Sequence, residues 1–284
     1  MPTSVSDLRS RAIQVLTQAG VPTPDADAEL LIGHVLGLTR GQVQAKAVTD
    51  AGVGPDDAMT VLEAVERRAA REPLQHITGR AAFRSLELAV GPGVFVPRPE
   101  TETVAQVAID ALMSVASASP VAVDLGTGSG ALALALATEV PHSSVVGVEN
   151  SARAFVWTKQ NARGVDNLRL VFADLAVAVP ELDGTVDVVV SNPPYIPVGA
   201  IPRDPEVRLH DPEHALYGGA DGLDVVRAVS VRARALLRTG GTLVLEHGEL
   251  QGAAIRELLT ADGWRAPVTT PDLLGRDRAT SATR

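Results

Sequence analysis

The sequence contains no cysteine among its 284 residues. This absence excludes disulfide bridges, thiolate nucleophiles and cysteine-ligated zinc, and it fits a reducing compartment. Long apolar runs are also missing, since the most apolar windows, such as GALALALA, are too short to span a bilayer. The opening residues, MPTSVSDLRS, lack the basic patch and apolar stretch of a secretory signal. We therefore expect a cytoplasmic protein that does not bind membranes.

Positive charge is scarce as well. The 34 acidic residues outnumber the 25 Lys and Arg residues, giving a formal net charge of −9, and Lys46 and Lys159 are the only lysines. Proteins that bind nucleic-acid backbones usually have the opposite balance, because neutralising phosphates requires clustered positive charge. Arginines do cluster between residues 67 and 84, which weakens this argument somewhat. We expect no stable nucleic-acid binding, no metal site and a monomer.

The first part of the chain, residues 1–75, has the pattern of a small helical bundle. Apolar residues recur at helical spacing, and TPDADAELLIGHVLG places a capping threonine before a proline at the first helical position. These helices carry no catalytic constellation, which favours packing or docking of a partner. Glycines, prolines and the alternating LELAV then predict a hairpin-containing connector over residues 76–98.

Residues 99–284 alternate between β-branched and helical segments. The expected strands are VAVDLG, SVVGVE, LRLVFA, VDVVVS and GTLVLEHG. Such alternation predicts parallel strands joined by crossover helices, hence an α/β fold with a Rossmann-like doubly wound sheet. ALALALA alternates like a strand, but alanine and leucine are strong helix formers and follow a glycine turn, so we predict a helix there.

A glycine-rich turn follows the first expected strand. It comprises Gly126, Thr127, Gly128, Ser129 and Gly130. Glycines let the backbone approach a ligand closely, and the following helix offers unpaired N–H groups, which predicts a nucleotide-type ligand. Gly128, Gly130 and Ala133 also fit the alanine-ended dinucleotide fingerprint, so this motif alone does not separate NAD from S-adenosylmethionine.

Acidic residues follow the next two expected strands. Glu149 ends SVVGVE, where a carboxylate can accept hydrogen bonds from ribose hydroxyls. Alternatively, Glu149 is a solvated residue at the end of a strand and binds no ligand. Asp174 in VFADL lies where it could reach an adenine edge, with a local Asx-turn as the alternative.

The fourth expected strand ends in SNPPY. Pro193 and Pro194 cannot donate hydrogen bonds and hold an extended backbone, so they present carbonyl oxygens. Asn192 adds a further acceptor, and Tyr195 adds an aromatic face. Two converging acceptors match the two N–H bonds of an NH2 group on a planar carbon. Alternatively, SNPPY is only a proline-rich turn with no ligand.

These motifs resemble those of the Rossmann-like, S-adenosylmethionine-dependent methyltransferases of the HemK/PrmC family, which methylate a release-factor glutamine. The resemblance extends over nearly the whole chain through REPLQHITG, VFVPRPETE, VDLGTGSG, SNPPYIP, HALYGGADGLD, LVLEHG and GRDR. The tetrapeptide NPPY alone is less specific, because enzymes that methylate DNA amino groups share it. The resemblance implies S-adenosylmethionine as cofactor and class I release factors as the protein substrate.

The resemblance also implies roles for individual residues. Residues 126–130 would cradle the methionyl part of the cofactor, and Glu149 would hold its ribose. Asp174 and the backbone of Leu175 would flank the adenine. The substrate amide would be held by the NPPY residues, with Asn192 and Pro193 accepting its N–H bonds and Tyr195 packing over its plane; these residues are Asn192, Pro193, Pro194 and Tyr195.

The PRPETE loop, around Arg98, Glu100 and Thr101, would line the same pocket, although helix-start chemistry explains it equally well. Two departures from the family pattern stand out. Glu149 stands where the family usually has Asp. His210-Asp211-Pro212 stands where the family often has an aromatic residue, Glu and Pro. We therefore assign residues 210–212 only a role in shaping a lid between Tyr195 and Leu223.

The sequence therefore predicts methyl transfer to the side-chain amide nitrogen of the glutamine in the Gly-Gly-Gln motif of class I release factors. A glutamine methyltransferase for a ribosomal protein would share every chemical motif. A DNA amino-methyltransferase is disfavoured by the acidic composition. A cofactor-binding protein without catalysis would not need the acceptor pair, and an NAD-dependent oxidoreductase ranks last.

Overall fold

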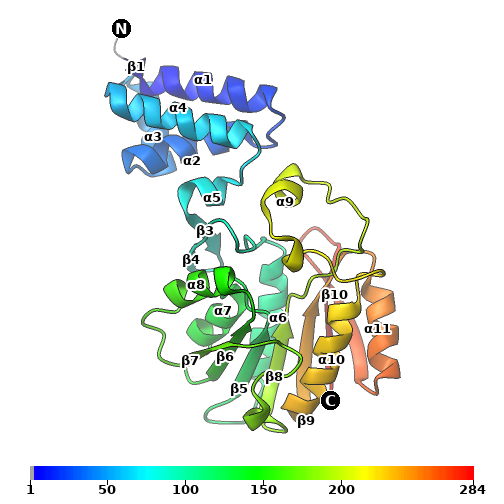
Figure 1. Ribbon diagram of the computed structural model, residues 1–284. Helices are drawn as coiled ribbons and strands as arrows, with labels where there is room; N and C mark the ends of the chain where they lie inside the picture. The colour runs from blue at the N-terminus through cyan, green and yellow to red at the C-terminus, as the bar shows by residue number, and fades with distance from the viewer. Residues whose placement is uncertain (1–2) are drawn as a thin grey trace. The chain divides into compact units, whose positions relative to one another are not determined.

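The computed structural model describes residues 3–284. The chain divides into two units (Figure 1). One unit takes in the chain up to Arg80 together with Pro202–His210, and the other consists of Ala81–Ile201 and Asp211–Arg284. The boundaries predicted from the sequence placed no segment after residue 98 with the first helices, so the grouping of Pro202–His210 is a difference.

The first unit is built from helices around an apolar core. Its helices are α1 (Val5–Gln18), α2 (Pro24–Leu36), α3 (Arg40–Val48), α4 (Pro55–Ala69), α5 (Leu74–Thr78) and α9 (Pro205–His210). A short antiparallel pair joins β1 (Thr3–Ser4) to β2 (Gly52–Val53). Ser4 and Asp7 form a capping box that begins α1, and Leu8, Leu16 and Leu31 are buried in the core.

The second unit contains a seven-stranded sheet. Its strands are β5 (Val121–Leu125), β6 (Ser144–Glu149), β7 (Leu168–Phe172), β8 (Val186–Ser191), β9 (Leu237–Glu246), β10 (Arg265–Pro271) and β11 (Asp277–Thr283). The order is β10-β11-β9-β8-β5-β6-β7, and β5 to β9, the five expected strands, pair in parallel. The antiparallel pairs of β11 with β9 and with β10 were not predicted.

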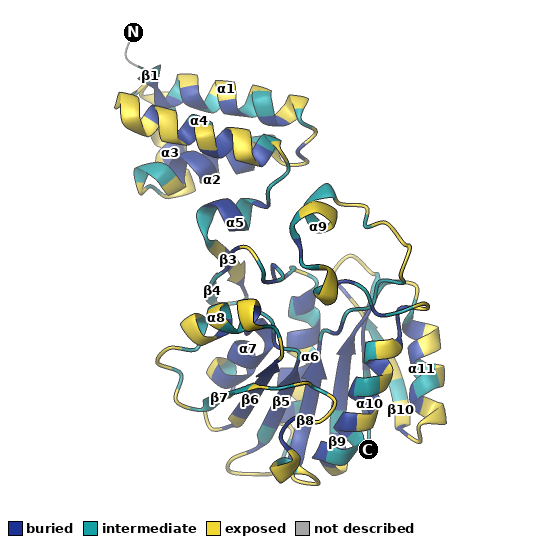
Figure 2. Ribbon diagram, in the orientation of Figure 1, coloured by how far each residue is buried: buried dark blue, intermediate teal, exposed yellow. Residues whose placement is uncertain are grey.

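Helices cover both faces of this sheet, so the predicted doubly wound α/β fold is confirmed. The helices of this unit are α6 (Thr101–Met113), α7 (Ala131–Glu139), α8 (Ala152–Asn161), α10 (Asp224–Leu236) and α11 (Gly252–Ala261). Ala122 of β5 packs in one cluster with α6 and α7, whereas Val123 packs in another with α10 and α11. The central strands β5, β6 and β8 are almost entirely buried, whereas the outer strands β7 and β10 contain no buried residue (Figure 2). The helix predicted for ALALALA is α7.

Two smaller features complete this unit. The expected hairpin is formed by β3 (Arg80–Phe83) and β4 (Leu86–Ala89), which make a two-stranded sheet. Single-turn 3-10 helices occur at Pro180–Leu182 and Glu213–Ala215.

Across residues 3–284, none of the helices combines the length and apolarity needed to cross a membrane.

The sheet order places a topological switch point beside β5. From β5 the chain proceeds outward through β6 and β7 on one side, and later through β8 and β9 on the other. In doubly wound sheets, ligands bind at the carboxyl ends of the strands where the order reverses. The glycine turn follows β5 and the NPPY segment follows β8, so both lie at this edge.

Candidate active site

The glycine turn adopts a backbone that requires glycine. Gly126, Gly128 and Gly130 have φ values of 81°, 58° and 89°, in the left-handed region that other residues rarely occupy. A Cβ on Gly130 would also lie 3.2 Å from side-chain carbons of Leu134 and Thr158. Thr127, Ser129 and Gly130 are buried, whereas Gly128 is half-buried with nothing within 4 Å of its Cβ position, so the space that a ligand needs lies beside Gly128.

Asp124, in β5, holds this turn in place through hydrogen bonds, a role that was not predicted from the sequence. Its Oδ2 accepts hydrogen bonds from the Thr127 hydroxyl at 2.6 Å and from the Ala133 N–H at 3.1 Å. Burial raises the pKa of Asp124 to about 7. An acidic residue inside an otherwise apolar strand was a signal available in VAVDLG.

Helix α8 holds the same turn from the side. The Thr158 hydroxyl donates to the Gly128 carbonyl at 2.5 Å, and the Asn161 amide donates to the Ser129 carbonyl at 2.9 Å. Asn161 also donates to the Ala89 carbonyl at 3.0 Å and accepts from the Ala89 N–H at 2.7 Å. These two residues were not predicted, because no local spacing marks a helix side chain that reaches a distant loop.

Glu149, at the end of β6, is only 7% exposed, so its carboxylate is not a solvated strand end. One oxygen accepts from the Gly128 N–H at 2.9 Å, and the other accepts from the Ser151 N–H at 2.6 Å. The carboxylate thus lies against the glycine turn. An oxygen pair in this position fits the vicinal hydroxyls of a ribose.

Asp174 and Leu175 follow β7. Asp174 is exposed, and its Oδ1 accepts from the Ala176 N–H at 2.9 Å, which is the Asx-turn named as the alternative. The Leu175 side chain lies 4.0 Å from the position of a Cβ on Gly126. Of the pair, Leu175 has the closer contact with the glycine turn, and its apolar side chain suits the face of a planar base.

The NPPY segment begins at the end of β8. The buried Ser191 hydroxyl donates to the Leu125 carbonyl at 2.6 Å, which joins the end of β8 to the end of β5. Asn192 comes next and is half-buried, and its carboxamide makes no hydrogen bond to any other residue within 3–284. Pro193 is buried and Pro194 is half-buried. The amide of Asn192 is therefore free to bind a ligand.

The HALYGGADGLD motif braces this segment. The Ile196 N–H donates to the Leu216 carbonyl, and the Gly218 N–H donates to the Ile196 carbonyl, both at 2.9 Å. A Cβ on Gly218 would lie 2.4 Å from the Pro194 carbonyl oxygen, and one on Gly222 would lie 2.3 Å from that of Tyr195. These two glycines let the backbone press directly against the NPPY turn.

Tyr195 lies among buried charged groups. Its hydroxyl donates to Glu246 Oε1 at 3.5 Å, and its carbonyl accepts from the Gln251 amide at 2.9 Å. Burial, with the nearby Glu246 carboxyl, raises the pKa of Tyr195, so its hydroxyl stays protonated. Burial also raises the pKa of Glu246 to about 7. Glu246 was not predicted as a site residue, although it stands in the quoted LVLEHG motif.

Within the PRPETE loop, Arg98 has a defined partner. Its guanidinium donates to Asp211 Oδ2 at 2.5 Å and lies 5.0 Å from the centre of the Phe95 ring. Glu100 occupies the N-cap position of α6, but its side chain makes no capping hydrogen bond. Asp211, one of the departures from the family pattern, is thereby the ion-pair partner of Arg98.

These features fit S-adenosylmethionine. The open space beside Gly128 suits the methionyl part, the buried Glu149 carboxylate suits the ribose, and Leu175 offers an apolar surface for the adenine. The assignment of each residue to a part of the cofactor stays a prediction.

Comparisons with known proteins agree with this arrangement. Residues 7–79 match the PrmC N-terminal domain family, and residues 86–201 match the methyltransferase small domain family. The release factor glutamine methyltransferase of Streptomyces coelicolor is 50% identical over 275 residues, covering 96% of this chain and 95% of the relative. A 4-amino-L-phenylalanine/4-methylamino-L-phenylalanine methyltransferase of Streptomyces pristinaespiralis is 42% identical over 254 residues, covering 87% of this chain and 84% of the relative.

A solved structure shares the fold. The 16S rRNA N2 G1207 methyltransferase of T. thermophilus, in complex with AdoMet and guanosine, has a TM-score of 0.52 and 22% identity. The match covers 72% of this chain and 49% of that chain. The resemblance seen in the sequence motifs and the expected cofactor, S-adenosylmethionine, are both confirmed. With half of its residues identical to a relative over nearly the full length of both chains, this protein belongs to the family of release factor glutamine methyltransferases.

Proposed function

We propose that the protein transfers a methyl group from S-adenosylmethionine to the side-chain amide nitrogen of the glutamine in the Gly-Gly-Gln motif of class I release factors. The observation that carries this proposal is the unbonded Asn192 carboxamide at the end of β8, next to the strand that bears the glycine turn. We expect the protein to act as a cytoplasmic monomer, without stable nucleic-acid or membrane partners.

The chemistry requires alignment more than acid–base catalysis. A glutamine amide nitrogen is a poor nucleophile, because its lone pair is delocalised into the carbonyl group. The cofactor supplies a methyl group already activated by its sulfonium. The oxygens of Asn192 and Pro193 accept the two N–H bonds of the amide, direct the lone pair toward the methyl group and stabilise positive charge that develops on nitrogen. As the N–CH3 bond forms, the S–CH3 bond would break and leave a neutral thioether, and one N–H proton would pass to solvent.

Tyr195 would cover the amide plane. Its protonated hydroxyl donates to Glu246 and its carbonyl is held by Gln251, so the ring is positioned from both ends. Pro194 keeps the backbone between Pro193 and Tyr195 extended and close to Gly218.

The pair of acceptor oxygens also suits an amino group on an aromatic ring, since both are NH2 groups on planar carbons. The relative that methylates 4-amino-L-phenylalanine makes this a second candidate. The release-factor relative has the higher identity and the fuller coverage, which favours glutamine.

One incubation separates these candidates. Purified release factor and 4-amino-L-phenylalanine are offered in parallel with methyl-labelled S-adenosylmethionine, and the modified peptide is mapped by mass spectrometry. We expect one methyl group on the Gly-Gly-Gln glutamine and none on a release factor in which that glutamine is replaced by glutamate. Label on another residue, or on the amino acid alone, would contradict the proposal.

A further inference from the structure

The segment Pro202–His210, here called the strap, belongs structurally to the helical unit. The chain leaves the methyltransferase unit after Ile201 and returns to it at Asp211, shortly after the NPPY turn. The strap contains helix α9, whose Glu206 forms ion pairs with Arg68 and Arg71 of the helical unit. A segment next to the candidate catalytic turn is thus part of the unit for which the sequence predicts partner docking.

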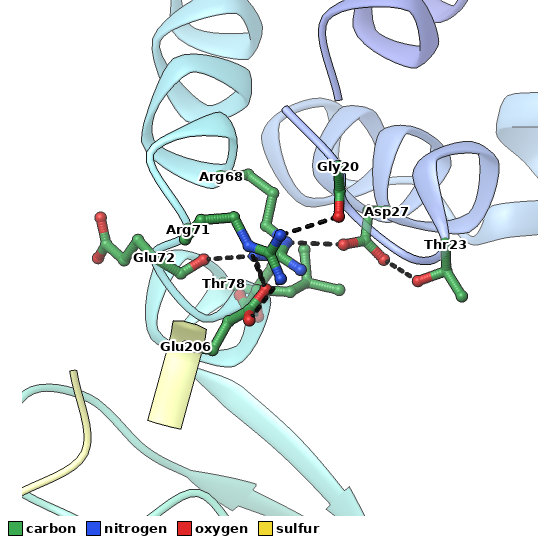
Figure 3. Close-up of polar contacts among 9 residues, drawn as sticks. Gly20, Thr23, Asp27, Arg68, Arg71, Glu72, Thr78 and Glu206 are labelled. Atoms are coloured by element: carbon green, nitrogen blue, oxygen red, sulfur yellow. Dashed lines mark hydrogen bonds and ion pairs between the residues drawn. The ribbon is translucent and has the colours of Figure 1, made fainter. Parts of the chain in front are cut away.

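Glu206 attaches the strap. Its side chain is 12% exposed and points from α9 toward two arginines at the end of α4 (Figure 3). The Arg71 guanidinium donates from Nε to Oε1 at 2.9 Å and from Nη2 to Oε2 at 2.7 Å, while Arg68 Nη1 lies 2.8 Å from Oε1. Burial alone would raise the pKa of Glu206, but the hydrogen bonds from Arg71 and Arg68 lower it to about 2. The carboxylate is therefore ionised.

The helical bundle builds this carboxylate site from its own residues. Arg68 donates to Asp27 at 2.7 Å, and Asp27 accepts from the Thr23 hydroxyl at 2.9 Å. Arg71 donates from Nη1 to the Gly20 carbonyl at 2.8 Å. The buried Arg68 is also paired with Asp27, whereas the half-buried Arg71 has its ion pair with Glu206. Loss of the Glu206 charge would therefore leave Arg68 its pair with Asp27 and Arg71 its bond to the Gly20 carbonyl, so Arg71 is the arginine that loses its ion pair.

The backbone at Arg71 supports the same conclusion. Its φ is 68°, and it follows the C-cap of α4, a position where glycine is favoured. The strained residue is thus the one whose guanidinium binds both oxygens of Glu206.

We propose that Glu206 is a positioning residue for the protein substrate, holding the strap on the helical bundle so that both bind the release factor as one surface. This inference rests on the proposed function. Arg203, Arg208 and Leu209 of the strap are exposed and available to a partner. Because Glu206 does not belong to the NPPY or glycine turns, its loss affects capture of the protein substrate and leaves methyl transfer itself intact.

Glu206→Gln tests this proposal, with Glu213→Gln as the matched control because Glu213 is exposed and close to the strap. The first readout is trypsin cleavage after Arg203 and Arg208, which needs no substrate. We expect faster cleavage in Glu206→Gln than in the control and the wild-type protein. Arg71→Gly serves as a second variant, since glycine suits the backbone there, and it should release the strap in the same way.

The second readout is steady-state kinetics. For Glu206→Gln we expect KM for the intact release factor to rise about tenfold, equivalent to about 1.4 kcal/mol, with kcat, KM for S-adenosylmethionine and turnover of a short Gly-Gly-Gln peptide nearly unchanged. Faster strap cleavage with unchanged KM for the release factor would overturn the proposal, as would unchanged cleavage in both variants. If the wild-type protein methylates no release factor, the proposed function fails instead, and the cleavage result still reports on the attachment of the strap.

Discussion

The candidate site places side-chain oxygen atoms of Asp124, Glu149 and Asn192 at or near the carboxyl ends of β5, β6 and β8. Asn192 keeps its carboxamide unbonded, whereas Asp124 and Glu149 use theirs to hold the glycine turn. The residue types in NPPY and the glycine turn could be predicted from the sequence, because their chemistry is local. Asp124, Thr158 and Asn161 act through distant contacts, so their roles emerge only from the fold.

Replacing Asn192 by alanine should nearly abolish methyl transfer and leave S-adenosylmethionine affinity within a few fold. The change removes one of the two acceptors that stabilise charge on the amide nitrogen, and losing one such group typically lowers kcat by about 10²–10³-fold. Single-turnover kinetics and calorimetric titration measure the two quantities. Asn161→Ala is the contrasting variant, since loss of its bonds to Ser129 and Ala89 should weaken cofactor binding first. Normal turnover in Asn192→Ala would contradict the mechanism.

The raised pKa of Asp124 predicts a pH dependence of stability. The folded protein retains a proton up to about pH 7, whereas an unfolded Asp loses it near its ordinary value of 3.8. Protonated Asp124 therefore adds to the free energy of unfolding. This stabilisation is fully present below the unfolded pKa of 3.8 and is lost as the pH rises to about 7. Between pH 5.5 and 8 the unfolding free energy should fall by about 2 kcal/mol from this group.

Asp124→Asn removes that ionisation and keeps an oxygen for the bonds that Oδ2 now accepts from Thr127 and Ala133. Denaturant unfolding at several pH values should show a smaller decline for this variant than for the wild-type protein. Equal declines would show that Asp124 does not titrate in this range. Burial also raises the pKa of Glu246, which adds a decline of the same sign to both proteins.

At the element scale, the strands that build the site were predictable and those at one edge were not. β5, β6 and β8 are rich in valine and almost fully buried, so their pattern is clear from the sequence. β10 and β11 read RAPVTTP and DRATSAT, which lack an apolar run; β11 pairs with β9, and β10 pairs with β11. Pairing with neighbouring strands determines where β10 and β11 lie, and the strand propensity of their own residues does not.

The brace between HALYGG and NPPY predicts a steric effect at Gly218. An added Cβ would lie 2.4 Å from the Pro194 carbonyl oxygen, so Gly218→Ala must displace the NPPY turn. We expect a loss of activity of at least tenfold and a destabilisation of about 1–3 kcal/mol. Gly41→Ala, in α3 with nothing within 4 Å of the added Cβ, is the control and should preserve both. Equal activity of the two variants would show that close packing of Gly218 against the NPPY turn is not needed for activity.

For the whole molecule, the fold class could be predicted from the alternation of strands and helices. The inclusion of the strap in the helical unit could not be predicted from the sequence. Arg71 and Glu206 are 135 residues apart in the chain; Arg71 opens the REPLQHITG motif, but nothing in that motif indicates Glu206 as its partner. Such a contact has no local signature, because it depends on how the chain returns to an earlier unit. The site motifs cluster for the opposite reason: parallel strands bring their carboxyl ends to one edge.

The most direct test of the central claim is a crystal structure with S-adenosylhomocysteine and a Gly-Gly-Gln peptide. We predict the glutamine side-chain nitrogen at about 3 Å from both Asn192 Oδ1 and the Pro193 carbonyl oxygen, facing the cofactor sulfur. A glutamine side chain bound elsewhere, or one that presents its carbonyl oxygen to these two acceptors, would contradict the account.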